Sequence, residues 1–331
     1  MARRVVVTGA EGFIGSHLAE ALVHKGFTVR ASVQYQPDGS IGWLRDLPAE
    51  VLSQIEIFPC DVRDSARVRA ALTGQQEVFH LAALIAIPFS YLSPESYIDT
   101  NVRGTLNVLQ AARDLGTERL LITSTSEVYG TAQFVPITEN HPLQAQSPYA
   151  ASKIAADKLA ESFFRSYGLP VTTVRPFNTY GPRQSARAII PGMAMQMLSG
   201  KTTLKVGNLS PKRDLVCVFD TVEGFIRLAG CEAAVGEEVN IATGTSVVME
   251  DLVREMGRMI FPEKELLLEP DPERVRPAAS EVYELCGSAE RLQALTGWKP
   301  GIPLAEGLAL TLSWLREKGT AYGYASSGFH L

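Results

Sequence analysis

A glycine-rich turn follows the first apolar segment of the chain, and it constrains the fold more than any other feature. Residues 3–8 contain the apolar run Val5-Val6-Val7 and predict a short buried strand. Gly9, Gly12 and Gly15 follow at once, and apolar residues then recur with helical spacing. In a unit made of a strand, a glycine loop and a helix, the loop backbone can approach a pyrophosphate closely. The N-terminus of the helix attracts the negative charge of that pyrophosphate. The turn therefore predicts a dinucleotide site, with a glycine-rich turn that binds no ligand as the alternative.

The ends of the next strands indicate which dinucleotide to expect. A strand over residues 28–33 ends at Val33, where an acidic residue would normally bind the adenosine ribose of NAD. Gln34 can hydrogen-bond the ribose instead, and residues 35–39 contain no arginine cluster to hold a 2′-phosphate. NAD is therefore favoured and NADP is left open. Asp61 lies at a strand end suited to the adenine, or it caps the following helix.

A hydroxyl, a carboxylate, a phenol and an ammonium lie further along, in Thr125, Glu127, Tyr149 and Lys153. Residues four apart share one face of a helix, so Lys153 can lie one turn from Tyr149. Its ammonium, together with a cationic nicotinamide ring, would favour the phenolate and lower the pKa of the tyrosine. Such a tyrosine can accept a proton from a sugar hydroxyl. A surface charge is the alternative for Glu127, but its position beside Thr125 favours catalysis.

Six motifs occur in order along nearly the whole chain: Gly9-x-x-Gly12-x-x-Gly15, His80-Leu81-Ala82-Ala83, Asn101-x-x-Gly104-Thr105, residues 124–130, Tyr149-x-x-x-Lys153 and residues 175–183. This series resembles the extended short-chain dehydrogenase/reductases that act on nucleotide sugars, the NAD-dependent epimerase/dehydratase family. Residues 42–44, 179–191 and 274–277 make it most similar to the NDP-N-acetylglucosamine 4,6-dehydratases of the legionaminic-acid pathway type. One departure is Ser126-Glu127, where some 4,6-dehydratases have an Asp-Glu pair.

The resemblance implies a nucleotide-sugar 4,6-dehydratase acting on NDP-N-acetylglucosamine or NDP-glucose. Tyr149, activated by Lys153 and Thr125, would take the O4 proton while hydride leaves C4 for the cofactor. Glu127 would then remove the C5 proton, and Glu127, Ser126 or a water would protonate the departing C6 hydroxyl. Return of hydride to C6 would give an NDP-4-keto-6-deoxy sugar. A 4-epimerase, a UDP-glucuronate decarboxylase and a 5,6-dehydratase remain alternatives, as does a non-catalytic nucleotide sensor.

The residues expected to contact the cofactor come from the turn and the strand ends: Gly9, Gly12, Phe13, Ile14, Gly15, Gln34, Asp61, Val62, Leu81, Ala82, Ala83, Tyr149, Lys153 and Pro176. The residues expected to bind the substrate are Asn178, which resembles the family's asparagine near the sugar diphosphate, and the arginines Arg183, Arg187, Arg213 and Arg276. Guanidinium groups bind phosphate oxygens through two parallel hydrogen bonds and keep their charge. His80 alone is more typical of a packed core histidine than of a catalyst.

Alternating strand and helix patterns predict an α/β fold, a Rossmann-type doubly wound parallel sheet with a smaller α/β substrate-binding lobe. Residues 1–175 are expected to bind the dinucleotide, with segments near 214–242 returning to that domain, and residues 176–331 mainly to bind the nucleotide sugar. Helices near 96–115 and 149–167 form a dimer interface in the family, so a homodimer is expected. The alternative is that these faces only cover the sheet.

Composition excludes other classes of function. The 331 residues are 46% hydrophobic with a formal charge of -5 and no long basic run, which argues against nucleic acid as the main partner. No apolar run is long enough for a membrane span, and residues 2–4 lead into the first strand without a secretory segment, so a cytoplasmic protein is expected. The four cysteines lack paired metal-ligand spacing, and no metal is expected.

Overall fold

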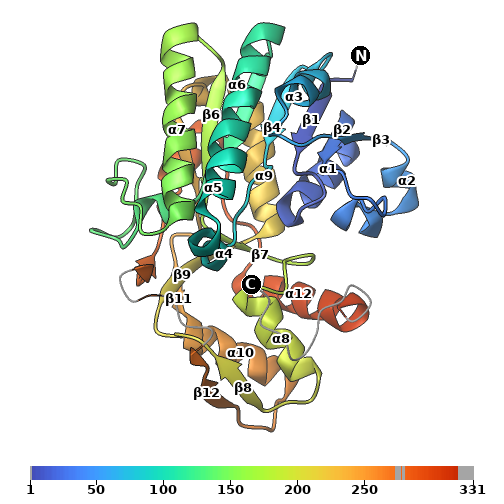
Figure 1. The fold of residues 1–331 in the computed structure, drawn as a ribbon. Helices are drawn as coiled ribbons and strands as arrows, with labels where there is room; N and C mark the ends of the chain where they lie inside the picture. The colour runs from blue at the N-terminus through green and yellow to red at the C-terminus, as the bar shows by residue number, and fades with distance from the viewer. Residues whose placement is uncertain (1, 273–276, 278–279, 320–331) are drawn as a thin grey trace.

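A seven-stranded parallel sheet forms the centre of the larger lobe, in the strand order β10-β6-β5-β4-β1-β2-β3 (Figure 1). The structure, a computed structural model, describes residues 2–272, 277 and 280–319. The strands of this sheet are β1 (Arg4–Thr8), β2 (Thr28–Val33), β3 (Ile55–Pro59), β4 (Glu77–His80), β5 (Arg119–Thr123), β6 (Val171–Pro176) and β10 (Glu238–Ile241). The strand order reverses between β1 and β4, and ligands of such sheets bind outside the carboxyl ends of the strands at this point. The predicted α/β fold of Rossmann type is confirmed.

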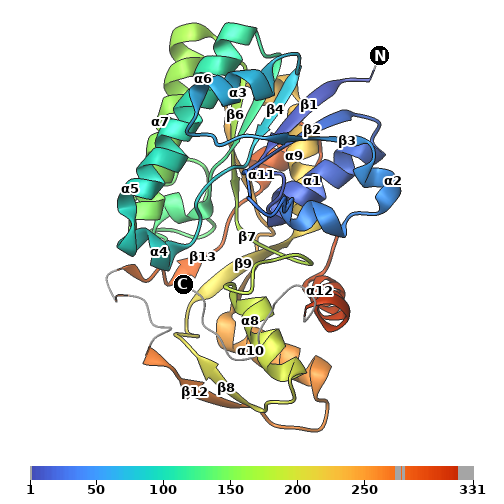
Figure 2. The same cartoon turned by 45° about the vertical axis from the view of Figure 1, so that its right-hand side comes forward.

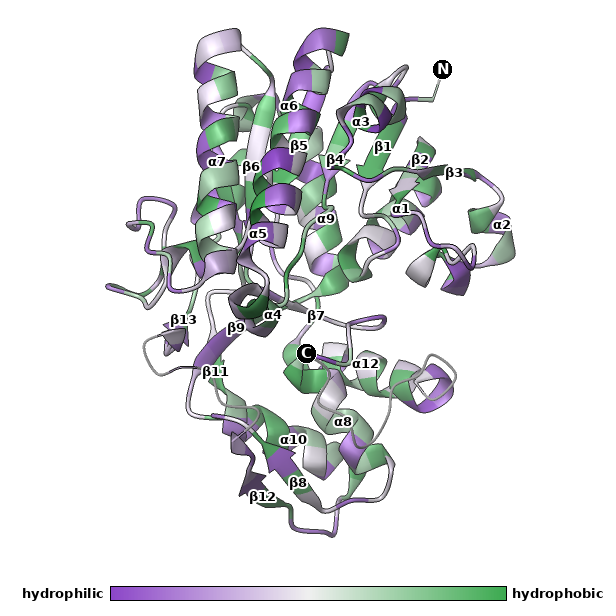
Figure 3. Ribbon diagram, in the orientation of Figure 1, coloured by the Kyte–Doolittle hydropathy of each residue, from purple (hydrophilic) through white to green (hydrophobic). Residues whose placement is uncertain are grey.

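Helices cover both faces of the sheet because its strands are apolar on both sides. One face carries α3 (Ser65–Leu72), α6 (Gly104–Leu115) and α7 (Pro148–Tyr167), which pack side by side. The other carries α1 (Phe13–His24), α9 (Val218–Ala229) and α11 (Glu290–Thr296). In Figure 3, strand β1 is green, whereas purple turns are prominent on the visible side of α6. Apolar side chains of the sheet are thus enclosed between two helical layers.

The helical stretch predicted to begin near Ser96 contains a wider turn. It consists of α5 (Pro94–Tyr97), the π-helical segment η2 (Ile98–Arg103) and α6. Asn101, in η2, accepts a hydrogen bond from the Leu84 backbone N–H at 2.8 Å and donates one to the Leu84 carbonyl at 2.9 Å. Its amide also donates to the Ser152 hydroxyl at 3.0 Å. Asn101 is therefore a satisfied buried amide that ties the loop after β4 to α7.

A second lobe with its own apolar core lies beyond the carboxyl ends of the large sheet (Figure 2). Its helices are α8 (Ile189–Leu198), α10 (Met249–Ile260) and α12 (Leu304–Lys318). Its short strands are β7 (Asn178–Tyr180), β8 (Thr203–Val206), β9 (Lys212–Cys217), β11 (Ser246–Val248), β12 (Leu267–Pro270) and β13 (Glu284–Leu285). Elsewhere in the chain, shorter helical segments connect the main elements: η1 (Gly42–Asp46), α2 (Ala49–Leu52), α4 (Ile87–Leu92), η3 (Ser126–Tyr129) and η4 (Glu232–Ala234).

The chain passes between the lobes more than once. After β9 in the small sheet, α9 and β10 return to the large lobe, and β10 pairs in parallel with β6. Val282, Leu285, Leu292 and Trp298 later join the core of the large sheet. Sequence continuity therefore does not separate the two lobes cleanly, and a division near residue 175 stays a prediction.

Candidate active site

The turn after β1 has a backbone that only glycine fits at two positions. Gly9 has a φ of +69°, and a Cβ there would lie 2.7 Å from the backbone N of Ala82. A Cβ on Gly15 would lie 2.2 Å from the carbonyl oxygen of Gly9. Gly12 caps α1 without any side-chain cap, so the first N–H groups of the helix keep their hydrogen-bonding capacity. This close approach and the uncapped helix start fit the pyrophosphate of a dinucleotide.

A cavity of about 870 Å³ runs from this turn into the second lobe. Every residue predicted to contact the cofactor lines it: Gly9, Gly12, Phe13, Ile14, Gly15, Gln34, Asp61, Val62, Leu81, Ala82, Ala83, Tyr149, Lys153 and Pro176. Except for Tyr149 and Lys153 on α7, these residues lie at or after the carboxyl ends of β1, β2, β3, β4 and β6, which explains why distant segments share one cavity.

Asp61 does not cap a helix, the alternative that its position at a strand end had left open. Asp64 caps α3 instead, with its carboxylate accepting hydrogen bonds from the backbone of Ala66 and Arg67. The Asp61 carboxylate pairs with the Arg63 guanidinium at 2.6 Å, and hydrogen bonds from Arg63 lower the pKa of Asp61. Asp61 thus faces the cavity as one half of an ion pair.

The predicted catalytic residues lie together in the wall of the same cavity: Thr125, Ser126, Glu127, Tyr149 and Lys153. Thr125 follows β5 and caps η3, and its Oγ1 accepts a hydrogen bond from the Glu127 backbone N–H at 3.2 Å. A side-chain hydrogen bond also joins Tyr149 to Thr125. Tyr149 and Lys153 come from the first turns of α7, which begins at Pro148 after the Ser147 cap. Two segments thus bring a hydroxyl, a carboxylate and a phenol to the wall of one cavity.

The pKa of Tyr149 differs from the sequence-based expectation for the protein alone. Burial raises it above its ordinary value, the hydrogen bond to Thr125 opposes that shift, and the nearby charge of Glu127 adds to it. Lys153 donates a hydrogen bond to the Thr123 carbonyl, and burial lowers the pKa of its ammonium to about 8. Because burial outweighs the Thr125 hydrogen bond and the nearby carboxylates oppose a second negative charge, the protein's own groups do not favour the phenolate. A cationic nicotinamide ring would have to supply the missing positive charge.

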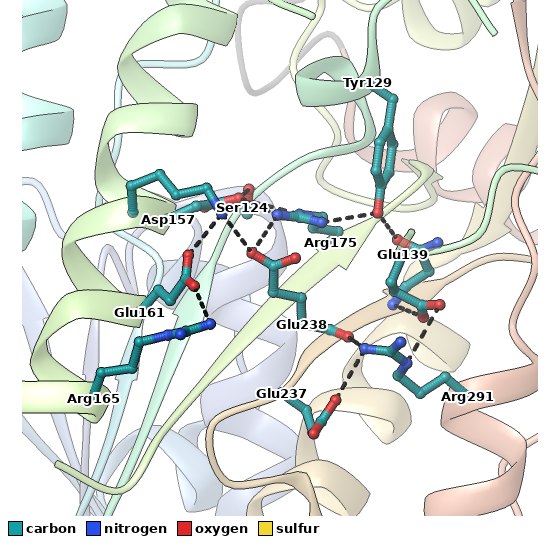
Figure 4. A network of polar contacts seen from close by, with 12 residues as sticks. Ser124, Tyr129, Glu139, Asp157, Glu161, Arg165, Arg175, Glu237, Glu238 and Arg291 are labelled. Carbon is teal, nitrogen blue, oxygen red and sulfur yellow. Dashed lines mark hydrogen bonds and ion pairs between the residues drawn. The ribbon is translucent and has the colours of Figure 1, made fainter. Parts of the chain in front are cut away.

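A polar network joins α7 to the neighbouring strands, with Asp157 and Arg175 at its buried centre (Figure 4). Asp157, one helical turn beyond Lys153, accepts hydrogen bonds from the Ser124 hydroxyl at 2.9 Å and from the Arg175 guanidinium at 3.0 and 3.1 Å. The side chains of Asp157 and Arg175 are fully buried, and Arg175 also pairs with Glu238 at 2.8 Å. The network joins α7 to β5, β6 and β10. It therefore sets the position of the helix that carries Tyr149 and Lys153.

The predicted substrate-binding residues separate into three groups. Asn178, Arg187 and Arg213 line the cavity, and the buried Arg213 lies 3.7 Å from the Glu281 carboxylate. Arg183 does not belong to this wall. Arg276 lies outside the described residues.

The structure corrects the prediction for Arg183. Its guanidinium is buried and pairs with Glu20 at 3.0 Å and with Asp46 at 3.4 Å, on the side of α1 and η1. Two carboxylates therefore already balance this charge, and the residue joins segments of both lobes. Arg183 therefore serves as a structural ion-pair partner and is not a candidate phosphate ligand.

His80 is a packed core residue, as predicted. Its Nδ1 lies 2.8 Å from the Thr8 hydroxyl and its Nε2 lies 3.1 Å from the Thr105 hydroxyl. Burial lowers the pKa of His80 to about 3, so its ring is neutral near pH 7. The histidine links β1, β4 and α6 beneath the nucleotide turn.

Sequence reasoning missed several polar residues of the wall: Glu11, Arg63, Gln184, Asn208 and Glu281. Glu11 had a usable signal, because it lies inside the glycine motif between Gly9 and Gly12. Arg63 follows β3, and Gln184, Asn208 and Glu281 lie in later loops, so their approach to the cavity depends on how distant segments of the chain pack. Within the described residues, no group of three or more histidine, cysteine or acidic side chains is arranged to hold a metal ion. None of the helices described is both long and apolar enough to span a bilayer.

The molecule has a doubly wound sheet with a glycine turn after its first strand. A tyrosine and a lysine four residues apart line the same cavity as this turn. These features define the class of extended short-chain dehydrogenase/reductases. Comparison with known proteins makes the assignment narrower. The family described as GDP-mannose 4,6 dehydratase matches residues 6–311, and the chain belongs to this family.

Individual relatives carry different activities. The UDP-glucose 4-epimerase of Mycolicibacterium smegmatis is 32% identical over 326 residues, which cover 95% of this chain and 99% of that protein. The dTDP-glucose 4,6-dehydratase of Streptomyces griseus is also 32% identical, over 96% of this chain and 95% of that protein. Among solved structures, the dTDP-glucose 4,6-dehydratase DesIV from Streptomyces venezuelae, with NAD and TYD bound, superimposes with a TM-score of 0.81. It is 29% identical, and the match covers 96% of this chain and 98% of that chain. Overall similarity therefore does not distinguish dehydration from epimerisation.

Proposed function

We propose that the protein is an NAD-dependent nucleotide-sugar 4,6-dehydratase. The observation that carries this proposal is the position of Glu127, which lines the cavity beside Thr125 and close enough to Tyr149 for its charge to raise the pKa of the phenol. Oxidation at C4 needs only a group that removes the O4 proton. A second base is useful when a proton must also leave C5, and Glu127 supplies one.

The first half of the reaction is assigned to Tyr149, Thr125 and Lys153. Tyr149 removes the O4 proton of the sugar, Thr125 orients the phenol by its hydrogen bond, and Lys153 provides positive charge one helical turn away. A nicotinamide dinucleotide held in the cavity would supply reversible hydride transfer, from C4 in the oxidation and to C6 in the final reduction. The turn at Gly9 to Gly15 would hold the pyrophosphate through backbone N–H groups.

The second half is assigned to Glu127 and Ser126. A ketone at C4 acidifies the C5 proton, which Glu127 removes as the C6 hydroxyl departs as water. Protonation of that hydroxyl falls to Glu127 itself, to the Ser126 hydroxyl or to an ordered water. The product is an NDP-4-keto-6-deoxy sugar.

We assign the substrate diphosphate to the second lobe. Arg187 and Arg213 line its part of the cavity and carry guanidinium groups suited to phosphate oxygens, while Asn178 is suited to the sugar diphosphate. Arg276 remains a further candidate from its sequence motif. NDP-N-acetylglucosamine and NDP-glucose are the proposed substrates.

Mass spectrometry of reactions with a panel of nucleotide sugars tests the activity. The purified chain is incubated with UDP-, GDP-, CDP- and dTDP-linked glucose and N-acetylglucosamine and with UDP-glucuronate, with and without added NAD. Loss of water from one of the hexoses supports dehydration and identifies base and sugar together. Loss of carbon dioxide from UDP-glucuronate makes the protein a decarboxylase. An unchanged mass with a new epimer makes it a 4-epimerase, and no reaction at all favours a binding role.

The role of Glu127 has a separate test. Glu127→Gln should still bind the nucleotide sugar but lose deuterium exchange at C5 in D₂O by about a hundredfold or more, because general-base catalysis contributes about that much. Ser126→Ala is the companion variant and should retain exchange, since Ser126 is assigned only to the leaving hydroxyl. Exchange that persists at the wild-type rate in Glu127→Gln would remove Glu127 from the role of base.

A further inference from the structure

The strand end that normally supplies an acid to the adenosine ribose has none here. Strand β2 ends at Val33 and Gln34 follows. A carboxylate at this place usually accepts hydrogen bonds from the ribose hydroxyls of NAD. Glu11 brings a carboxylate to the same place from the turn after β1, and its Oε1 accepts a hydrogen bond from the Gln34 backbone N–H at 2.9 Å. The neighbouring turn thus supplies the group that β2 lacks.

The second oxygen of this carboxylate is available to a ligand. Glu11 Oε2 is buried and has no hydrogen-bond partner among the residues described. Glu11, Ser32 and Gln34 line the same cavity as Gly12. Burial raises the pKa of the Glu11 carboxyl, and the Gln34 amide opposes that shift. A buried polar oxygen without a donor is unfavourable, so a ligand hydroxyl that reaches it gains a strong hydrogen bond.

The backbone around Glu11 keeps its position. The Glu11 carbonyl accepts a hydrogen bond from the Trp43 N–H at 2.9 Å, which packs η1 against the turn. Gly42 has a φ of +57°, and a Cβ there would lie 2.5 Å from the same carbonyl oxygen. Arg63 also lines the cavity, but its guanidinium is already paired with Asp61. The positive charge of Arg63 is therefore balanced by Asp61. Within the described residues, Glu11 forms no ion pair, and its Oε2 accepts no hydrogen bond.

We propose that Glu11 recognises the adenosine ribose and makes the enzyme selective for NAD over NADP. Oε2 accepts a hydrogen bond from the ribose 2′-hydroxyl while Oε1 keeps its bond to Gln34. A 2′-phosphate removes that hydroxyl donor and brings negative charge against the carboxylate, which disfavours NADP. The inference rests on the proposed use of a nicotinamide dinucleotide.

Calorimetric titration of the full chain, freed of any co-purified nucleotide, tests this inference. NAD⁺ and NADP⁺ are titrated into the wild type, Glu11→Gln, Glu11→Ala and Gln34→Ala. Glu11→Gln retains an oxygen for the Gln34 amide, so it preserves the local fold, and thermal melting checks this. It should weaken NAD⁺ binding by about tenfold and reduce the preference for NAD⁺ over NADP⁺ by about tenfold or more. Glu11→Ala should lose the preference in the same direction.

Gln34→Ala distinguishes the two candidate ribose ligands. It should change the preference by less than about threefold, because only the backbone of Gln34 bonds Glu11. An unchanged preference in both Glu11 variants would overturn the proposal, and loss of preference in Gln34→Ala instead would assign the ribose to Gln34. A wild-type chain that binds neither nucleotide would contradict the proposed function itself. NAD⁺ binding with unaltered selectivity in the variants contradicts only the role of Glu11.

Discussion

At the scale of single residues, burial controls the charge of two histidines next to the nucleotide turn. His17 on α1 contacts the Pro182 carbonyl at 2.9 Å, and burial together with the nearby Arg183 charge lowers its pKa to about 3. His80 is held between two threonine hydroxyls, and burial lowers its pKa to about 3 as well. In the unfolded chain these rings take up protons at the ordinary value of 6.5. Folding therefore requires both rings to stay neutral.

This difference predicts how stability depends on pH. Below pH 6.5 the unfolded state binds protons that the folded state does not, so stability falls as pH falls toward 3, by about 1.4 kcal/mol per pH unit for each histidine. His17→Gln, which retains a donor for the Pro182 carbonyl, should reduce the slope between pH 6.5 and 5 by about that amount. Urea unfolding over this range measures it, with the exposed His24→Gln as control. Parallel slopes for the wild type and His17→Gln would contradict the prediction.

At the scale of elements, helix α7 carries Tyr149 and Lys153 in its first turns and the buried Asp157 one turn further on. Asp157 joins the helix to β5 through Ser124 and to β6 through Arg175, all inside the protein (Figure 4). On the outer side of the same helix, Glu161 pairs with Lys158 and Arg165 at 2.7 Å in partly exposed positions. A buried pair that loses one partner leaves an uncompensated charge, whereas an exposed pair is screened by water.

Two substitutions on α7 should therefore have unequal effects. Asp157→Ala should lower the free energy of unfolding by about 3–5 kcal/mol, because Arg175 stays buried with less counter-charge. Glu161→Ala, the matched control, should cost less than about 1 kcal/mol. Denaturant unfolding monitored by circular dichroism gives both values. Similar losses in the two variants would show that the buried network does not anchor the helix.

At the scale of the whole molecule, contacts between distant segments hold the two lobes together. Asp46, next to the nucleotide turn in η1, accepts a hydrogen bond from the Trp314 indole at 3.0 Å and pairs with Lys318, both on α12. Arg183 adds a third contact from the second lobe. Contacts from α12 and from Arg183 thus converge on Asp46 and hold the second lobe against η1.

The outer faces of α6 and α7 lead to a prediction about assembly. These helices pack side by side over one face of the sheet, and Ala151 is exposed on α7. We expect a homodimer in which the two helices meet those of a second copy, as the family resemblance implies. Multi-angle light scattering should give twice the chain mass, and Ala151→Arg should shift it toward the monomer. Ala66→Arg, at an exposed position on α3, should stay dimeric. A monomeric wild type would leave these faces as a cover for the sheet.

The parts of the site that follow a local pattern were predictable. The glycine spacing indicates a tight turn wherever a strand leads into a helix, and Tyr149 and Lys153 share a helix face because of the helical repeat. The strand ends come together because parallel strands share one carboxyl edge. All the predicted cofactor contacts therefore line one cavity.

The charged groups were less predictable, because their roles depend on which side chains meet across long stretches of chain. Arg183 carries the residue type of a phosphate ligand, yet Glu20 and Asp46 pair with it inside the protein. Burial raises the pKa of Tyr149, and a sequence motif does not indicate how deeply a side chain is buried. The sequence by itself determined the α/β fold and the location of the nucleotide turn, since periodicity and glycine spacing act locally. Only the tertiary structure decided which carboxylates and guanidinium groups face the cavity, because that follows from contacts between segments far apart in the chain.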